Sequence, residues 1–353
     1  MRGEKIGIAL SGGVDSSVSA ALLQEQGYRV HGFFMRLPVP GTEEQARRVR
    51  AVARKLAIPL FLIDLAKYFS DRVIAYFVDS YLQGLTPNPC VICNRRIKFG
   101  LLAEEMRKQG VHRMATGHYA RIECSAHGLP LLRRGLDSKK DQSYFLCRLS
   151  GSQLQQTVLP LGGLAKEEVR RMAAARQLND IHGPESQDVC FLAGETIPSF
   201  FTAHGLRERP GDIVTAGGRV IGRHRGLWRY TIGQRRGLNL PDATPWYVRE
   251  LDAANNRVMV CKGEELLTRR VMISDVRWHG EEPPLPWHGL VQIRGRHTPS
   301  PARVGQIGGK WYIDFDQSQR AVTPGQFAVF YRQDVLVGSG IMLRSGYLEE
   351  SPG

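Results

Sequence analysis

Residues 5–17 read KIGIALSGGVDSS, and this stretch decides the fold. Residues 5–10 form a short apolar run typical of a buried strand, and a helical pattern extends from about Val14 to Gln26 and ends at Gly27. The Ser/Gly turn between them suits phosphate, because backbone N–H groups at a helix N-terminus bind anions and glycine lets a ligand approach. The Gly-Lys-Ser/Thr ending of a Walker loop is absent.

Side chains of this turn are candidate ligands for a nucleotide. The hydroxyl groups of Ser11, Ser16 and Ser17 suit pyrophosphate, and Asp15 suits Mg²⁺ or a positioned water. A plainer alternative is a turn that only caps a helix.

Strands and helices alternate after the turn. We expect a strand at Arg29–Met35, a helix at Thr42–Ala57 and a strand at Pro59–Ile63. This order predicts an α/β fold with a parallel, doubly wound sheet whose ligands lie at the carboxyl ends of the strands. The next expected elements are a helix at Tyr68–Leu82, a stiff exposed loop at Gly84–Cys90, a helix at Arg95–Lys108, a strand at His112–Thr116, a hairpin within residues 121–150 and a helix at Lys166–Gln177.

Helical patterns give way to short alternating segments from about Pro210 onward. We therefore predict three domains: an α/β domain at residues 1–205, a small β domain at 206–269 and a C-terminal antiparallel β-barrel at 270–353.

The chain of 353 residues carries a formal charge of +14 and has a pI near 9.8. It contains no apolar run of about 18 residues or more, so we expect a cytoplasmic protein. The charge favours a nucleic-acid partner, although a generally basic soluble protein is the alternative. Residues 213–241 contain no acidic residue and hold several cations and aromatic rings, which suits RNA: Arg219, Arg223, Arg225, Arg229, Arg235, Arg236, Trp228 and Tyr230.

The chain has six cysteines and no secretion signal, which indicates reduced thiols. Cys90 and Cys93 form a Cys-x-x-Cys pair ahead of a basic helix, and Cys190 lies in Glu185–Leu192. A helix N-terminus and nearby cations lower a thiol pKa, so Cys93 is a candidate thiolate. Half of a zinc site is the alternative for the pair, and buried free thiols are the interpretation of Cys124, Cys147 and Cys261.

Several blocks together resemble one family. The turn at residues 11–17, Asn88–Phe99, Ala115–Ala120, Lys140–Leu146, Cys190-Phe191 and Tyr230–Leu238 are similar to the tRNA-specific 2-thiouridylases, in order and across nearly the whole chain. The turn itself resembles the pyrophosphatase loop of the adenine nucleotide alpha hydrolase-like superfamily.

The resemblance implies an enzyme that adenylates the C2 carbonyl oxygen of the wobble uridine, releases pyrophosphate, and replaces the oxygen with sulfur. It implies ATP and Mg²⁺ as cofactors, tRNA of the Lys, Glu or Gln type as substrate, and a sulfur-donor protein or sulfide source; nothing indicates DNA or a membrane. The implied ATP ligands are Ala9, Leu10, Ser11, Gly12, Gly13, Val14, Asp15, Ser16, Ser17, Met35 and Gly117. The implied tRNA contacts are Asn88, Pro89, Cys90, His118, Lys140, Asp141, Gln142, Arg294, Gly295 and Gln326.

Two positions depart from the family pattern: Cys90 stands where Asp is usual, and Gly295 where Tyr is usual. By resemblance, Cys93 is the nucleophile and Cys190 carries persulfide sulfur, with Cys90 a spare or resolving thiol. Alternatively, Cys90, Cys93 and Cys190 ligate three irons of a 4Fe-4S cluster whose fourth iron holds the sulfide. These two routes to sulfur transfer remain open at the level of sequence.

Two other functions fit part of the pattern. One is an enzyme with the same nucleotide fold that uses an amine nucleophile, and the other is a non-catalytic tRNA-binding protein. Loss of Cys93 or Cys190 would spare amination, and cleavage of ATP to AMP would exclude a mere binding protein.

Overall fold

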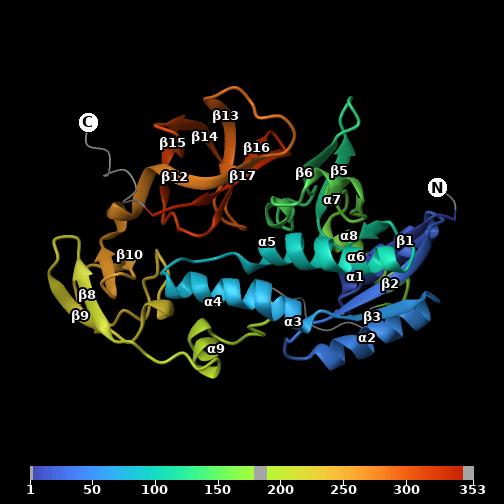
Figure 1. The fold of residues 1–353 in the computed structure, drawn as a ribbon, viewed down its shortest axis with the longest axis horizontal. Coiled ribbons are helices and arrows are strands. Elements are labelled where there is room, and N and C mark those ends of the chain that lie inside the picture. Colours follow the sequence, from blue (N-terminus) through green and yellow to red (C-terminus); the bar gives the residue numbers. More distant parts are fainter. Residues whose placement is uncertain (1–2, 179–188, 345–353) are drawn as a thin grey trace. The chain divides into compact units, whose positions relative to one another are not determined.

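The computed structural model describes residues 3–178 and 189–344 and divides into two compact units (Figure 1). The first unit comprises Met1–Ile74, Pro89–Ala193 and Asp334–Val337, and the second comprises Ala75–Asn88, Gly194–Gln333 and Gly338–Gly353. The finer division into three domains at residues 205 and 269 stays a prediction. Within the described ranges, no helix is long and apolar enough to cross a membrane.

A five-stranded parallel sheet forms the centre of the first unit, as predicted. Its strand order is β3-β2-β1-β4-β7, with the bounds β3 Leu60–Asp64, β2 Arg29–Arg36, β1 Lys5–Ala9, β4 Arg113–Ala115 and β7 Thr157–Val158. β1 pairs with β2 on one side and with β4 on the other. The turn that follows β1 therefore lies at the carboxyl edge of the sheet, near its middle.

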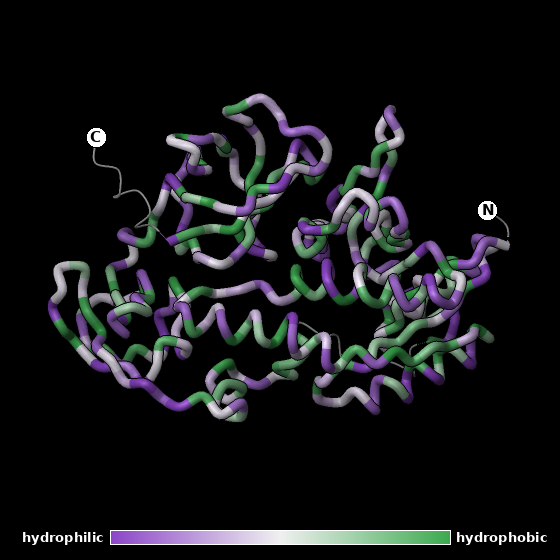
Figure 2. The backbone as a smooth tube through the Cα atoms, in the orientation of Figure 1, coloured by the Kyte–Doolittle hydropathy of each residue, from purple (hydrophilic) through white to green (hydrophobic). Residues whose placement is uncertain are grey.

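Helices cover both faces of this sheet. Helices α1 (Val14–Glu25) and α2 (Thr42–Lys55) pack on one face, in a core that includes Ile6 and Ile8. Hydrophobic and hydrophilic residues alternate along α2, as expected for a helix with one buried side (Figure 2). On the opposite face, a Cβ at Gly7 would lie only 2.7 Å from Met106 Sδ of α6 (Ala103–Lys108), so glycine permits this close packing.

The helical region between β3 and β4 differs from prediction. The expected helix at Tyr68–Leu82 is interrupted by a π turn: its parts are α3 Ala66–Phe69, η1 Ser70–Ile74 and α4 Ala75–Leu82. The helix expected from Arg95 begins earlier, as α5 Pro89–Cys93, and continues as the π-helix η2 Asn94–Leu102 before α6. Proline suits the first position of a helix, so the predicted loop ends at Asn88 and both cysteines are helical.

The remaining elements of the first unit include the predicted hairpin, as β5 and β6, and the predicted helix, as α8, while η3 and α7 were not predicted. They are β5 Ala120–Cys124, β6 Pro130–Arg134, η3 Ser143–Leu146, α7 Gly151–Gln155 and α8 Lys166–Ala175. Helix α8 packs against α1 through a small core that includes Val18, Val169 and Ala173.

The second unit is built mainly from antiparallel strands. It contains α4, α9 (Ile197–Ala203), the 3-10 turns η5 Leu227–Arg229 and η6 Gly263–Leu266, and a four-stranded sheet of order β10-β11-β8-β9. The strands of this sheet are β8 Gly211–Thr215, β9 Val220–His224, β10 Tyr247–Asp252 and β11 Arg257–Cys261.

The predicted C-terminal barrel is confirmed. Its strands are β12 Leu267–Trp278, β13 Trp287–Gln292, β14 Ser300–Ile307, β15 Lys310–Arg320, β16 Phe327–Arg332 and β17 Val335–Met342 (Figure 1). The order is β12-β15-β14-β13-β16-β17, and β12 also pairs with β17, which closes the ring. Closure leaves no exposed strand edge within the ring.

Candidate functional site

The turn between β1 and α1 is held by its own serines. The Ser11 N–H donates to Ser16 Oγ (3.2 Å), and the hydroxyl groups of Ser16 and Ser17 donate to the Gly13 carbonyl (3.2 and 3.0 Å). Gly12 has φ +76°, a left-handed conformation that favours glycine. Gly13 caps α1 with no side-chain hydrogen bond, so the N-terminus of the helix is left open to an anion.

Ser17 does not fit the role predicted for it. Its side chain is fully buried, and its hydroxyl is used by the Gly13 carbonyl. Because a ligand needs exposed surface, Ser17 contributes to the shape of the turn rather than to a side-chain contact with pyrophosphate.

Asp15 is tied to two residues that are distant in sequence. Lys166 Nζ lies 2.8 Å from both Asp15 Oδ1 and Oδ2, and the Tyr119 hydroxyl donates to Oδ1 (2.8 Å). Sequence reasoning proposed Asp15 as a ligand of Mg²⁺ or water and missed both partners. Lys166 is 151 residues away, and the sequence indicates it only as the first residue of a predicted helix.

Gly117 packs directly against this helix N-terminus. A Cβ at Gly117 would lie 2.9 Å from Asp15 C and Ser16 N, both of them backbone atoms. Met35 lies near the carboxyl end of β2, Ala9 ends β1, and Gly117 follows β4 by two residues. The structure therefore brings the predicted ATP residues to neighbouring strand ends at one sheet edge.

Cys90 and Cys93 lie three residues apart on α5 and so share one face of the helix. The expectation that Cys93 has a lowered pKa is wrong. Burial raises the pKa of the Cys93 thiol to about 12 and that of Cys90 to about 11, and Lys98 offsets only part of this effect. Cys93 lies within the continuous helical segment formed by α5 and η2, more than one turn after its first residue, Pro89, so it is not at the helix N-terminus.

Cys190 belongs to the same group of thiols. Burial is the main cause of the raised pKa of Cys90 and Cys93, and a negative charge on Cys190 would raise both pKa values further. The Cys190 side chain is exposed, yet neighbouring protein still raises its pKa. The ring of the next residue, Phe191, contacts Phe69 of α3 edge-on at 6.0 Å between ring centroids, which anchors this segment. Residues 185–188 lie outside the described residues.

The described residues offer no site for a single metal ion such as zinc. Among residues 3–178 and 189–344, no three Cys, His, Asp or Glu side chains lie close enough to hold one metal ion. A 4Fe-4S cluster is a different case, because each of its three cysteines would bind a different iron.

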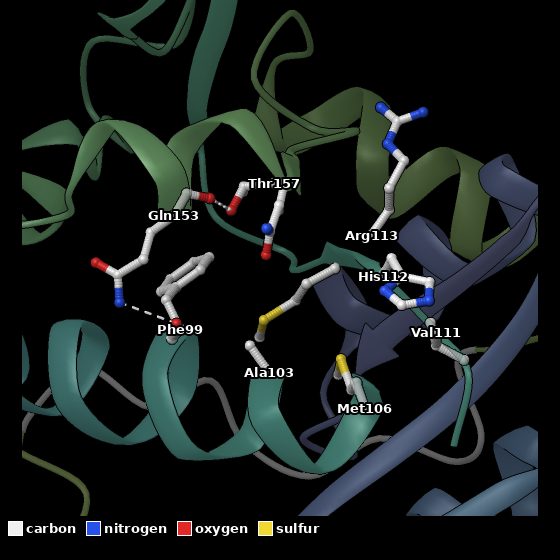
Figure 3. Close-up of a pocket in the computed structure, with 10 residues that line it drawn as sticks. Phe99, Ala103, Met106, Val111, His112, Arg113, Gln153 and Thr157 are labelled. Carbon is white, nitrogen blue, oxygen red and sulfur yellow. Dashed lines mark hydrogen bonds between the residues drawn. The ribbon is translucent and has the colours of Figure 1, made fainter. Parts of the chain in front are cut away.

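The π-helix that follows Cys93 is supported by Gln153 of α7 (Figure 3). A π turn interrupts the regular α-helical hydrogen-bond ladder, and Gln153 Nε2 donates to the carbonyls of Arg95 and Phe99, at 2.9 Å each. Phe99 and Gln153 line a pocket together with Met106 and Thr157, and this pocket contains none of the predicted site residues.

The first-unit residues predicted to contact tRNA differ in burial and in hydrogen bonding. His118 Nδ1 lies 2.7 Å from Thr116 Oγ1, and burial holds the pKa of His118 well below 6.5, so the ring is neutral at pH 7. Gln142 Oε1 accepts from the Tyr119 N–H (3.0 Å), and Lys140 is half-buried.

Asp141 does not fit the predicted contact with tRNA. Its side chain is only 4% exposed, and its carboxylate accepts from Arg134 Nε (2.8 Å), Gly135 N (2.9 Å) and Ser143 N (3.0 Å). The carboxylate therefore organises its own turn.

In the second unit, Gln326 anchors the segment that ends at Asn88. Gln326 Nε2 donates to the carbonyls of Thr86 (2.9 Å) and Pro87 (3.0 Å), and Asn88 Nδ2 lies 3.4 Å from Gln326 Oε1. The chain enters the first unit at the next residue, Pro89, which is followed by Cys90.

Arg294 and Gly295 lie in a short segment that follows β13. Their carbonyls accept from Gln292 Nε2, at 3.0 and 3.2 Å, and the Arg294 side chain is exposed.

The cation-rich stretch at residues 213–241 is only partly available to RNA. Trp228 and Tyr230 are buried, so these rings cannot stack on bases as expected. Arg225 and Arg229 both pair with Glu208 at 2.8 Å. Glu208 precedes the stretch and was not considered in the sequence. Arg219, Arg223, Arg235 and Arg236 remain exposed.

Selective alkylation tests the state of the cysteines. Because only the thiolate reacts, we expect iodoacetamide at pH 8 to modify exposed Cys124 first and Cys93 very slowly. Modification of Cys93 should then accelerate about tenfold per pH unit up to its raised pKa. Peptide mass spectrometry measures both rates, and equal labelling of Cys93 and Cys124 at pH 7 would contradict the raised pKa.

The parallel sheet with its Ser/Gly turn at the carboxyl edge defines an ATP-using enzyme of the HUP class. Residues 4–194 match the tRNA methyl transferase HUP domain, residues 199–262 the tRNA methyl transferase PRC-barrel domain, and residues 268–342 the aminomethyltransferase beta-barrel domain. The tRNA-specific 2-thiouridylase MnmA of Desulfotalea psychrophila is 46% identical over 341 residues, which cover 96% of this chain and 98% of that protein. The same enzyme of Trichlorobacter lovleyi is 44% identical, over 95% and 96% of the two chains. The chain belongs to the tRNA-specific 2-thiouridylase family.

A solved structure with weaker similarity is the U34-tRNA thiolase NcsA from Methanococcus maripaludis with its [4Fe-4S] cluster. It is 16% identical with a TM-score of 0.37, and the match covers 58% of this chain and 68% of that one. At this level of similarity, the presence of a cluster does not pass to the present chain.

Proposed function

We propose that this enzyme replaces the C2 oxygen of the wobble uridine, position 34 of tRNA, with sulfur. The observation that carries the proposal is a turn suited to phosphate in the same unit as Cys90, Cys93 and Cys190, in a chain that matches thiouridylases over nearly its full length. The family relatives are thiouridylases rather than methyltransferases.

The first step is adenylation of the uridine. The uridine O2 attacks the α-phosphorus of ATP, the bond from that phosphorus to the bridging oxygen breaks, and pyrophosphate leaves with the electron pair. The open N-terminus of α1 and the turn at residues 10–13 support binding of the phosphates there, with Mg²⁺ on the triphosphate.

The second step is sulfur transfer by way of a persulfide. A sulfur-donor protein or other persulfide source loads Cys190, whose exposure suits such an encounter. The terminal sulfur then attacks C2 and displaces AMP, which takes the oxygen. Attack of Cys93 on Sγ of Cys190 forms a disulfide and releases 2-thiouridine, and an external thiol reduces the disulfide before the next turnover.

Burial has a consequence for this second step. Cys93 is a thiol at neutral pH in the structure, so it must lose its proton during the reaction. Cys90 stands where the family usually has Asp, and its own raised pKa makes it no substitute for a carboxylate base. We propose that Cys90 is a spare or resolving thiol. The alternative is a 4Fe-4S cluster on Cys90, Cys93 and Cys190, which would supply sulfide instead.

The substrate we propose is tRNA of the Lys, Glu or Gln type. Support comes from the net charge of +14 and from exposed cations in the second unit, including Arg235, Arg236 and Arg294. His118 is neutral, so its contact with tRNA would be a hydrogen bond or ring contact rather than an ion pair with phosphate.

The test is reconstitution with anaerobically purified, iron-analysed enzyme. We expect iron-free protein to convert ATP to AMP and pyrophosphate only with tRNA present, and to form 2-thiouridine from a persulfide donor. Nucleoside mass spectrometry measures the product. If no AMP forms, the chain is a tRNA-binding protein and not an enzyme. If ammonium supports amination of tRNA, the amine alternative is favoured. If thiolation requires iron, the persulfide route is overturned.

A further inference from the structure

A buried lysine approaches the phosphate turn from a distant part of the chain. Lys166 is the first residue of α8 and is 6% exposed. Its Nζ lies 2.8 Å from both oxygens of Asp15, the second residue of α1, and 5.7 Å from the centroid of the Tyr119 ring. A positive charge is thus held at the helix N-terminus that suits an anion.

The position of this lysine is set by the core and not only by its ion pair. Helices α1 and α8 share buried Val18 and Val169. The Lys166 N–H donates to Asp137 Oδ2 (3.1 Å), and the preceding Ala165 N–H donates to Glu168 Oε2 (2.8 Å). The start of α8 is therefore fixed, and the ammonium group is preorganised.

Stability alone does not explain a buried lysine paired with a carboxylate whose side chain is 29% exposed. Removing a lysine charge from water has a cost that its attraction to a carboxylate largely offsets, so such a pair often adds little net stability. A fixed cation beside the phosphates is useful to a reaction that expels pyrophosphate, because charge develops on the leaving group.

We infer that Lys166 contacts the pyrophosphate part of ATP, with Asp15 and Tyr119 as positioning residues that hold its ammonium group. The inference rests on the proposed function, in which the turn binds ATP. When the bond between the α-phosphorus and the bridging oxygen breaks, the electron pair passes to the pyrophosphate oxygen, where Lys166 stabilises the negative charge without transferring a proton.

The experiment compares charge-balanced and unbalanced variants. Titration calorimetry with inorganic pyrophosphate and with Mg·ATP, without tRNA or a sulfur source, is applied to Lys166→Met, Asp15→Asn and the double variant. We expect Lys166→Met to bind both ligands at least about tenfold more weakly, because a hydrogen bond to a charged group is lost. The double variant should remain weak. Arg171→Met, which removes an exposed charge from the same helix, should bind like wild type.

The remaining outcomes contradict either the role of Lys166 or the proposed function. If the double variant binds with wild-type affinity, Lys166 serves only to neutralise Asp15 and the inference is overturned. Normal binding of both ligands by Lys166→Met also overturns it. Thermal melting shows whether the Lys166→Met variant is still folded. If it is not, the affinities of the double variant decide the question, because that variant carries no unpaired charge. Wild type that binds neither ligand would instead refute the proposed function.

Discussion

Replacing Cys190 with alanine is expected to abolish tRNA thiolation while one round of AMP formation persists. Removing a covalent sulfur carrier should reduce the rate by roughly 10³-fold or more. Adenylation uses the turn at the edge of the sheet and needs no thiol, so the first step should survive. Quenched-flow measurement of AMP and mass spectrometry of 2-thiouridine report the two steps separately.

The matched control is Cys124→Ala, which removes an exposed cysteine from β5 of the same unit and should leave both steps intact. The Cys93→Ala variant tests the release step directly. Without the attacking thiol, a disulfide between Cys190 and the thiolated base should persist, as a protein–tRNA adduct on a non-reducing gel that dithiothreitol dissolves. Normal thiolation by Cys190→Ala would eliminate the persulfide route.

The α/β fold was predictable because its signals are local. The apolar run at residues 5–10, the Ser/Gly turn and the stop at Gly27 each specify a short piece of backbone, and the structure has β1 and α1 there. The prediction of the helical region was wrong where two local rules for proline conflict. Proline looks like a helix breaker, but Pro89 begins α5, and only tertiary support such as Gln153 holds the π-helix beyond it.

The candidate site was predictable only in part, since charge and burial depend on packing. Asp15 was identified from the turn, but its partners Lys166 and Tyr119 come from other elements. Cys93 was expected to be ionised from its basic neighbours, yet desolvation outweighs Lys98. Trp228 resembled a stacking platform until its burial against Phe201 placed it in a core, with ring centroids 5.5 Å apart.

These differences share a physical cause. A motif names the residue types needed for chemistry, whereas solvent access decides what each one can do. Ser17 and Asp141 illustrate this, because the polar groups of both side chains form hydrogen bonds with the backbone of their own turns.

Gly117→Ala is expected to reduce AMP formation about 100-fold, since a catalytic loop moved by a fraction of an ångström loses its alignment. The new Cβ would lie 2.9 Å from Asp15 C and Ser16 N, and backbone atoms at that distance have to shift. The loss of stability should be about 1–3 kcal/mol, typical of overpacking, so the protein remains folded. Gly163→Ala is the control, because a Cβ there meets nothing within 4 Å and both stability and AMP formation should be unchanged. Tight ATP binding and normal AMP formation by Gly117→Ala, measured beside its melting temperature, would show that the phosphates of ATP do not depend on this helix N-terminus.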